Sequence, residues 1–212
     1  MAEKVVIGNA ELWHGDCREV LPTLAPCDLI LTDPPYGIGF AAQPTDYQRK
    51  NGMKPTDWDN ETPPAWLFGL MREKARNLIV WGGNYYDLPQ TRGWLSWRKP
   101  DAPPSMAHFE LAWTSFDMNA QQLEHSIAAT NGERVGHPTQ KPVKLYDWLL
   151  ANYAKPGQRI LDTHMGSGSI GIACHYYRCP LVTCEIDPDY FRAACDRIER
   201  ETAQADFYLP NA

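Results

Sequence analysis

The chain has 212 residues, which is enough for one full α/β domain with a sizeable core, or for one domain with a small insert. A hydrophobic content of 43% with 22% charged residues is ordinary for a globular protein and excludes wholesale disorder. The net charge of −6 excludes a protein that is basic throughout, so any surface that binds nucleic acid must be a local patch.

The chain begins without a signal-peptide pattern, and no stretch approaches the roughly 18 apolar residues that a membrane span needs. The six cysteines include no Cys-x-x-Cys pair. The even spacing of Cys174, Cys179 and Cys184 suggests a metal site, but the first is expected on a helix and the last on the following strand, which favours ordinary buried thiols. We therefore expect a cytoplasmic protein with no metal and no membrane contact.

Apolar and aromatic runs predict seven strands in chain order, at 11–16, 28–33, 77–83, 93–99, 109–115, 159–164 and 181–187. Helical patterns lie between or after them, at 63–76, 143–154, 169–178 and 188–204. Several strand runs do not alternate with polar residues, as expected for strands covered on both faces. This order predicts an α/β fold with a Rossmann-like, seven-stranded, mostly parallel sheet and helices on both faces.

Three regions depart from the strand–helix alternation. The runs 93–99 and 109–115 are joined only by a loop, which predicts an antiparallel hairpin at one edge of the sheet. The polar, turn-rich stretches 38–62 and 116–142 fit no element. Because polar loops of this length are uncommon in a compact domain and often carry function, we expect both to lie near a site.

A glycine-containing turn follows the predicted strand 159–164. The strand ends at Asp162, the turn contains Gly166 and Gly168, and the next strand ends at Glu185, 17 residues after Gly168. Glycines let the backbone approach a ligand closely, and an acid at this distance can accept hydrogen bonds from both hydroxyls of a ribose. The loop is neither GxGxxG nor a P-loop, so it favours a nucleoside without pyrophosphate, such as S-adenosylmethionine, over a dinucleotide or ATP. A purely structural turn is the alternative.

The tetrapeptide Asp33-Pro34-Pro35-Tyr36 follows an apolar run. The prolines donate no backbone hydrogen bond, so the strand must end there and their carbonyls are expected to be free acceptors. A carboxylate and a carbonyl beside an aromatic ring suit a flat ligand with an exocyclic amine, such as adenine or cytosine. The alternative is a proline-rich turn with a capping Asp.

These motifs together resemble those of the amino-methylating DNA methyltransferases. The resemblance rests on DPPY (33–36), GHPTQKP (136–142) and DTHMGSGS (162–169), with DPPY before the glycines as in the circularly permuted beta group. VWGGNYY (80–86) and FELAWTS (109–115) resemble small phage-type members. The resemblance implies a permuted methyltransferase fold, with 1–212 as one catalytic domain, a mobile loop at 38–62 and a short target-recognition segment at 116–135. It also implies a bacterial or phage-encoded enzyme that acts on double-stranded DNA.

The resemblance also implies roles for single residues. Asp33 and the Pro34 carbonyl would accept the two amine hydrogens of the target base, Pro35 would complete the catalytic turn, and Tyr36 would stack on the flipped base. His164 stands where relatives often carry Phe, so it is either a polar pocket residue or a packing residue. The implied S-adenosylmethionine-binding residues are Asp16, Cys17, Thr139, Lys141, Asp162, Gly166, Ser167, Gly168, Ser169 and Glu185.

Contacts with DNA must come from local basic residues, because the chain as a whole is acidic. Each candidate has acids nearby, so a solvated surface is the alternative for every one of them. The segment 116–135 is short, which predicts a short or relaxed target sequence, or recognition shared with a second subunit in a homodimer. The candidate DNA-binding residues are Arg49, Lys50, Lys54, Arg92, Arg98, Lys99 and Arg134.

Adenine N6 is the favoured acceptor, with cytosine N4 as the first alternative because DPPY occurs in both groups. RNA and a protein glutamine are further alternatives, although the glutamine-modifying relatives typically carry Asn in place of Asp33. A third interpretation is an inactive methyltransferase fold that only binds nucleic acid. The evidence against it is that the expected site residues are intact, namely Asp33, Tyr36, Gly166, Gly168 and Glu185. Direct transfer of methyl to an amine needs no covalent intermediate, so no nucleophilic cysteine is expected.

Overall fold

The computed structural model describes residues 2–42, 56–104, 106–132 and 137–203. The strands are β1 (Glu3–Ile7), β2 (Ala10–His14), β3 (Cys27–Thr32), β4 (Ala75–Trp81), β5 (Trp94–Arg98), β6 (Phe109–Thr114), β7 (Gln121–Glu124), β8 (Ile160–Asp162) and β9 (Leu181–Glu185). The α-helices are α1 (Cys17–Val20), α3 (Ala65–Lys74), α4 (Ile127–Asn131), α5 (Val143–Tyr153), α6 (Ser169–Tyr177) and α7 (Pro188–Ala203). Short 3₁₀ turns lie at Leu21–Thr23, Phe40–Ala42 and Gly83–Tyr85. No helix among these described ranges is long and apolar enough to cross a membrane.

All nine strands belong to one sheet, in the order β1-β2-β9-β8-β3-β4-β6-β5-β7. The expectation of seven strands was therefore wrong, because it missed the two edge strands, β1 and β7. β1 is short and largely exposed, and β7 (QQLE) has only one apolar residue, Leu123, so neither shows the pattern of a buried strand. The stretch 116–142, expected to hold no element, contains β7 and α4.

The sheet is mostly parallel, as predicted. The pairs β2–β9, β9–β8, β8–β3, β3–β4 and β5–β7 are parallel, and β1–β2, β4–β6 and β6–β5 are antiparallel. The predicted hairpin of β5 and β6 forms with Leu95 opposite Ala112. It does not lie at the edge, because β7 pairs with the outer side of β5.

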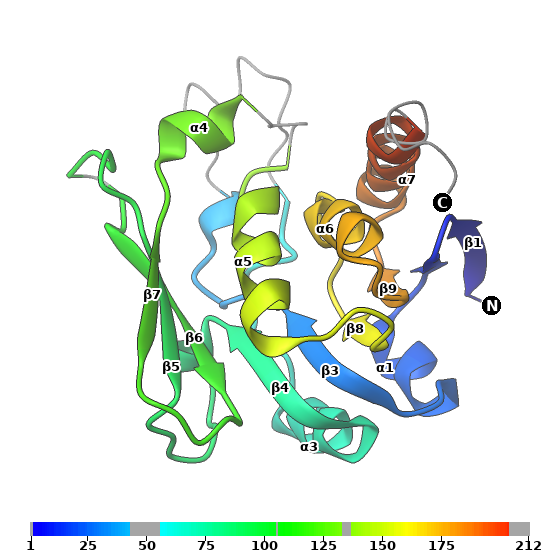
Figure 1. Ribbon diagram of the computed structural model, residues 1–212, viewed down its shortest axis with the longest axis horizontal. Helices are drawn as coiled ribbons and strands as arrows, with labels where there is room; N and C mark the ends of the chain where they lie inside the picture. The colour runs from blue at the N-terminus through cyan, green and yellow to red at the C-terminus, as the bar shows by residue number, and fades with distance from the viewer. Residues whose placement is uncertain (1, 43–55, 105, 133–136, 204–212) are drawn as a thin grey trace.

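Helices cover both faces of the sheet (Figure 1). On one face, Leu29 and Leu31 of β3 belong to a core that α5, α6 and α7 complete. On the other, Ile30 of β3 belongs to a second core with Leu67 and Met71 of α3 and residues of α1. Burial on alternate faces explains why these strands read as continuous apolar runs in the sequence.

The topology places the two predicted motifs at the same edge of the sheet. β9, β8, β3 and β4 are neighbouring parallel strands, so their carboxyl ends point the same way. β3 ends immediately before Asp33, β8 ends at Asp162 and β9 ends at Glu185. Ligands bind at this edge in open α/β sheets.

Candidate active site

A hydroxyl pair ties the two motifs together, although they lie 131 residues apart in the chain. The Oγ1 atoms of Thr32 and Thr163 are 2.8 Å apart, and the Thr163 amide donates to Thr32 Oγ1 at 3.2 Å. Both threonines are buried. We call residues Asp33–Tyr36 the proline corner and residues Gly166–Ser169 the glycine loop; this contact fixes the end of β3 against the end of β8.

The carbonyls of the proline corner already have one donor. The Tyr86 hydroxyl donates to the Pro34 carbonyl at 2.8 Å and to the Pro35 carbonyl at 3.0 Å. The expectation that these carbonyls are free was therefore wrong, because β4 is followed by a tyrosine that reaches across to them. Each carbonyl oxygen has two lone pairs, so each can still accept one further hydrogen bond.

A buried carboxylate holds the chain just after the corner. Asp59 accepts hydrogen bonds from the backbone amides of Tyr36 at 2.8 Å, Gly37 at 3.2 Å and Phe40 at 2.9 Å. This clamp fixes the exit direction of the chain from the proline corner. Asp59 was not predicted as a site residue, because nothing in its local sequence TDWDN (56–60) indicates that its partners lie some 20 residues earlier.

The Tyr36 ring is packed tightly in its place. Gly82 has φ of +70°, and a Cβ there would lie 2.2 Å from Tyr36 Cε1, so both the turn and the contact require glycine. The Tyr85 ring stacks on Tyr36 with centroids 5.0 Å apart and an angle of 15° between the planes. Tyr85 is half exposed, so it is a second aromatic surface at this point.

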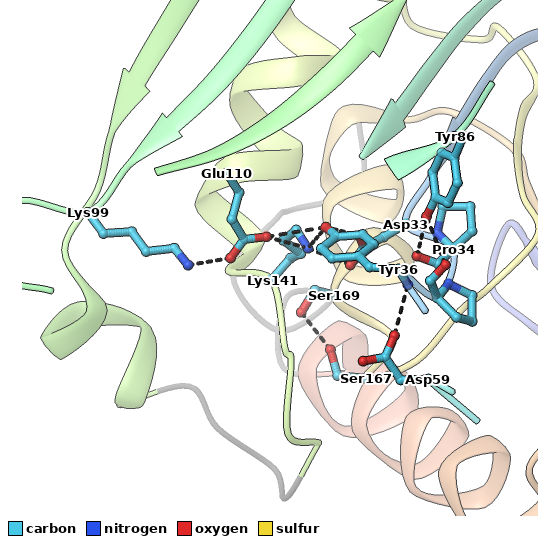
Figure 2. Close-up of polar contacts among 11 residues, drawn as sticks. Asp33, Pro34, Tyr36, Asp59, Tyr86, Lys99, Glu110, Lys141, Ser167 and Ser169 are labelled. Carbon is cyan, nitrogen blue, oxygen red and sulfur yellow. Dashed lines mark hydrogen bonds and ion pairs between the residues drawn. The ribbon is translucent and has the colours of Figure 1, made fainter. Parts of the chain in front are cut away.

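Four charged side chains form a row at the corner, with both lysines buried and both acids partly buried. Figure 2 shows this row, which we call the lysine–acid cluster. Its members are Asp33, Lys141, Glu110 and Lys99. Lys141 Nζ lies 2.6 Å from Asp33 Oδ2 and 3.0 Å from Glu110 Oε2, and Lys99 pairs with Glu110 Oε1. The Tyr36 hydroxyl donates to Asp33 Oδ1 at 2.8 Å.

Burial and pairing shift the pKa values in this cluster in opposite directions. Burial raises the pKa of Asp33; the Lys141 ammonium lowers it in part, and the Glu110 carboxylate raises it again. Burial would also raise the pKa of Glu110, but Lys141 and Lys99 outweigh it and lower that pKa to about 2. The two carboxylates beside Lys141 raise its pKa despite burial. Lys141 is thus a fixed cation between a firmly ionised Glu110 and a more easily protonated Asp33.

The glycine loop faces Glu185 across the end of β9. Gly166, with φ of +54°, donates its amide to Glu185 Oε2 at 2.9 Å, and the Asp187 amide donates to Oε1 at 3.0 Å. Each oxygen keeps a lone pair for a hydroxyl donor. Burial raises the pKa of Glu185 to about 7; the Asp187 and Gly166 amides lower it only in part, and the Asp187 and Asp162 carboxylates raise it further.

A single cavity of about 550 Å³ joins the two motifs, which is large enough for a nucleoside-sized ligand. His164 also lines it, and burial lowers the pKa of His164 to about 4, so the imidazole is neutral at pH 7. His164 is thus a partly buried residue that lines the pocket. The other predicted site residues that line the cavity are Asp33, Pro34, Pro35, Tyr36, Lys99, Thr139, Lys141, Gly166, Ser167 and Glu185.

Five predicted cofactor-binding residues do not line this cavity: Asp16, Cys17, Asp162, Gly168 and Ser169. The Asp162 carboxylate accepts the His164 amide at 3.0 Å, and burial raises its pKa to about 6. Ser169 Oγ accepts from the buried Arg197 of α7 at 2.8 Å, and Arg197 also donates to the Ser167 carbonyl at 3.0 Å. In this structure Asp162 and Ser169 support the backbone around the glycine loop rather than line the cavity.

Asp16 and Cys17 lie at the start of α1. Asp16 caps α1 by accepting the Arg18 amide at 2.8 Å, and it also pairs with the Arg18 side chain. Cys17 Sγ lies 4.0 Å from His164 Nε2. Burial raises the pKa of Cys17 to about 12, so its thiol is protonated at pH 7.

The structure separates the predicted DNA-binding residues. Lys99 is buried in the lysine–acid cluster, so the expectation of an exposed phosphate contact was wrong for it. Arg92 and Arg98 are exposed and pair with Asp117 and Glu124. Arg49, Lys50, Lys54 and Arg134 lie outside the described residues. The part of the chain that the structure describes contains no group of three or more His, Cys, Asp or Glu placed to hold a metal ion.

Similarity to known proteins agrees with this geometry. A family model described as DNA methylase matches residues 97–196. The type II methyltransferase M.HpaI of Haemophilus parainfluenzae is 31% identical over 221 residues, which cover 82% of this chain and 68% of that protein. Among solved structures, the M1.HpyAVI–SAM complex matches with a TM-score of 0.62 at 17% identity, covering 89% of this chain and 99% of that chain.

A second solved structure, the cytosine-N4-specific PvuII DNA methyltransferase, matches with a TM-score of 0.58 at 15% identity, covering 92% of each chain. At these identities the structural matches show a shared fold. The match to M.HpaI extends over most of both chains. The chain therefore belongs to the N6/N4 family of DNA methylases.

Proposed function

We propose that the protein transfers a methyl group from S-adenosylmethionine to the N6 amine of adenine in double-stranded DNA. The observation that carries this proposal is the single cavity lined by both the proline corner and the glycine loop with Glu185. One side presents acceptors for an amine and the other presents acceptors for a ribose. A shared cavity brings two reactants into one fixed geometry, which is the main requirement of direct transfer.

The residues present fit S-adenosylmethionine. Gly166 has no side chain to fill the cavity, and its hypothetical Cβ would lie 3.2 Å from His137 Nε2. Both Glu185 oxygens retain a lone pair for the ribose hydroxyls. When bound, the cofactor supplies an electrophilic methyl carbon on a sulfonium. Thr139, Gly166, Ser167 and Glu185 are the predicted cofactor residues that face it across the cavity.

Asp33 and the Pro34 carbonyl act on the acceptor. Each accepts one hydrogen of the exocyclic amine, which turns the nitrogen lone pair out of conjugation with the ring and toward the methyl carbon. The nitrogen would form a bond to the methyl carbon as the bond between that carbon and the cofactor sulfur breaks, which leaves a neutral thioether. The nitrogen would then release one proton, which the Asp33 carboxylate or water accepts. Tyr36 supplies an aromatic face for the base after it leaves the duplex.

The surroundings of the site support DNA as the substrate. Exposed Arg92 and Arg98 lie just before β5 and at its end, and the segment 116–135 carries β7, which pairs with β5, and α4. We assign target recognition to this segment and phosphate contacts to the two arginines. The order of the motifs, DPPY before the glycines, supports the permuted beta group. A segment this short is compatible with recognition shared between two copies of the chain.

Expression in a host that lacks DNA methylation tests the proposal. Nucleosides from the host DNA are separated by mass spectrometry, and modification-sensitive sequencing locates the site. N6-methyldeoxyadenosine that depends on intact Asp33 is the expected result. N4-methyldeoxycytidine would keep the reaction and change the base, whereas DNA without any new modified nucleoside would contradict the proposed function.

A further inference from the structure

Lys141 has a position that its sequence motif does not explain. The resemblance of the GHPTQKP motif (136–142) assigns it to the binding of S-adenosylmethionine. Its ammonium instead lies between two carboxylates of the acceptor side, 2.6 Å from Asp33 Oδ2 and 3.0 Å from Glu110 Oε2, and its side chain is 4% exposed (Figure 2). Nζ also lies 3.1 Å from the Tyr36 hydroxyl.

We propose that Lys141 is a positioning residue for methyl acceptance: held by Glu110, its ammonium keeps the Asp33 carboxylate ionised and oriented toward the target amine. The proposal rests on the proposed function, because it concerns how that reaction is supported. Lys141 acts through Asp33, and Glu110 acts through Lys141. Lys99 has the supporting role of balancing the charge of Glu110.

The geometry gives each member a separate task. The Tyr36 hydroxyl occupies one lone pair of Asp33 Oδ1 and Lys141 occupies one of Oδ2, so the carboxylate cannot rotate. A carboxylate has about four acceptor sites, which leaves two for the amine. Glu110 comes from β6 and Lys99 follows β5, so the hairpin beside the predicted recognition segment holds Lys141 in place.

The electrostatic reason is the burial of Asp33. A buried carboxyl tends to protonate, and a protonated Asp33 would offer a hydroxyl donor on one oxygen in place of an acceptor. Burial raises the pKa of Asp33, and Lys141 is the largest influence that lowers it. The other titratable groups that influence Asp33 or are influenced by it are Glu110 of β6, Tyr36 of the corner, Tyr86 after β4, Tyr146 of α5 and Asp162 of β8.

Single-turnover methyl transfer with saturating S-adenosylmethionine, followed as a function of pH, tests the proposal. Lys141→Met removes the cation and keeps the length of the side chain. As the pH is lowered, the rate should begin to fall about one unit or more earlier than in the wild type, because Asp33 protonates more easily. We call this low-pH fall of the rate the acid limb. Lys141→Arg should return the acid limb nearly to its wild-type pH, since it restores the charge.

Glu110→Gln provides a matched variant with the opposite sign. It removes the negative charge that raises the Asp33 pKa but keeps an amide oxygen that accepts from Lys141 Nζ, so the ammonium stays in place. The pH at which the rate falls should therefore move lower. A role that is only structural would shift neither limb in a charge-dependent direction. This comparison decides the matter even if Lys141→Met does not fold.

Binding of S-adenosylmethionine separates this proposal from the alternative role of Lys141. Folded Lys141→Met should bind the cofactor with a Kd within about twofold of the wild type, because the cation contacts the acceptor side. A folded variant that loses cofactor binding, or acid limbs that coincide in all variants, would overturn the proposal. Failure of the wild type to methylate any DNA would instead refute the proposed function, so the two failures are distinguishable.

Discussion

The glycine loop and the proline corner face one cavity, but their polar groups are held in different ways. Glu185 is held by two backbone amides, from Gly166 and Asp187, which lie within a short stretch of the same βαβ unit. Asp33 is held by side chains, Tyr36 from its own turn and Lys141 from more than 100 residues later. A site built from backbone amides is set by local sequence, whereas a site built from distant side chains depends on the whole fold.

Truncating the carboxylate of the proline corner should have the largest effect. Asp33→Ala removes an acceptor for the amine and one of the two acceptors of its proton, so methyl transfer should fall about 10²–10⁴-fold. The affinity for S-adenosylmethionine should change little, because Glu185 and the glycine loop are untouched. Asp33→Asn is the matched control and should lose less activity, since it keeps one acceptor oxygen. Rates and calorimetric Kd values check both statements; full activity of Asp33→Ala would contradict them.

The tight packing of Tyr36 can be broken without touching any polar group. Gly82→Ala places a Cβ 2.2 Å from the Tyr36 ring at a φ of +70°, so we expect a loss of about 2–4 kcal/mol in the free energy of unfolding and a lower rate of transfer. Gly157→Ala is the control, because Gly157 has φ of +85° with nothing within 4 Å of its Cβ. It should cost only the backbone term of about 1–2 kcal/mol and leave activity intact. If urea unfolding gave the same loss of unfolding free energy for Gly82→Ala and Gly157→Ala, the contact between position 82 and the Tyr36 ring would be excluded as a constraint.

Sequence patterns predicted the local parts of this molecule and missed the distant ones. The core strands, the helices α3, α5, α6 and α7, the glycine loop and the proline corner were predicted because each is encoded within one short continuous stretch of sequence. Glu110 and Asp59 were missed as site residues because their partners lie far away in the chain. Lys99 was assigned to the surface for the same reason: only the hairpin register shows that its side chain turns toward Glu110.

The clamp on the exit of the proline corner should have a smaller effect. Asp59→Ala leaves three backbone amides without their acceptor, which should lower the free energy of unfolding by about 1–3 kcal/mol. The loss of orientation should reduce transfer more than cofactor binding. The exposed neighbour Asp57→Ala is the control and should change stability by less than about 0.5 kcal/mol. Two variants with the same unfolding midpoint would mean that the clamp does not hold the corner.

The glycine-loop side should respond to pH through Glu185. Its folded pKa of about 7 exceeds the ordinary value of a glutamate, so this carboxyl favours the folded state most at low pH, and that contribution is lost as the pH rises through 7. Ribose hydroxyls donate to the ionised form, so the affinity for S-adenosylmethionine should rise by up to about tenfold between pH 6 and pH 8. Calorimetry at several pH values measures this slope. Glu185→Gln should bind more weakly and without the slope, and an equal slope in the variant would exclude Glu185 as its source.

The most direct measurement is a crystal structure of the protein with S-adenosylhomocysteine and an unmethylated DNA duplex that contains the target site found by sequencing. We predict a base turned out of the duplex, with its exocyclic nitrogen about 2.7–3.2 Å from both an Asp33 oxygen and the Pro34 carbonyl oxygen. The ribose hydroxyls of the cofactor product should lie on Glu185. A target amine that contacts neither acceptor of the proline corner would contradict the account.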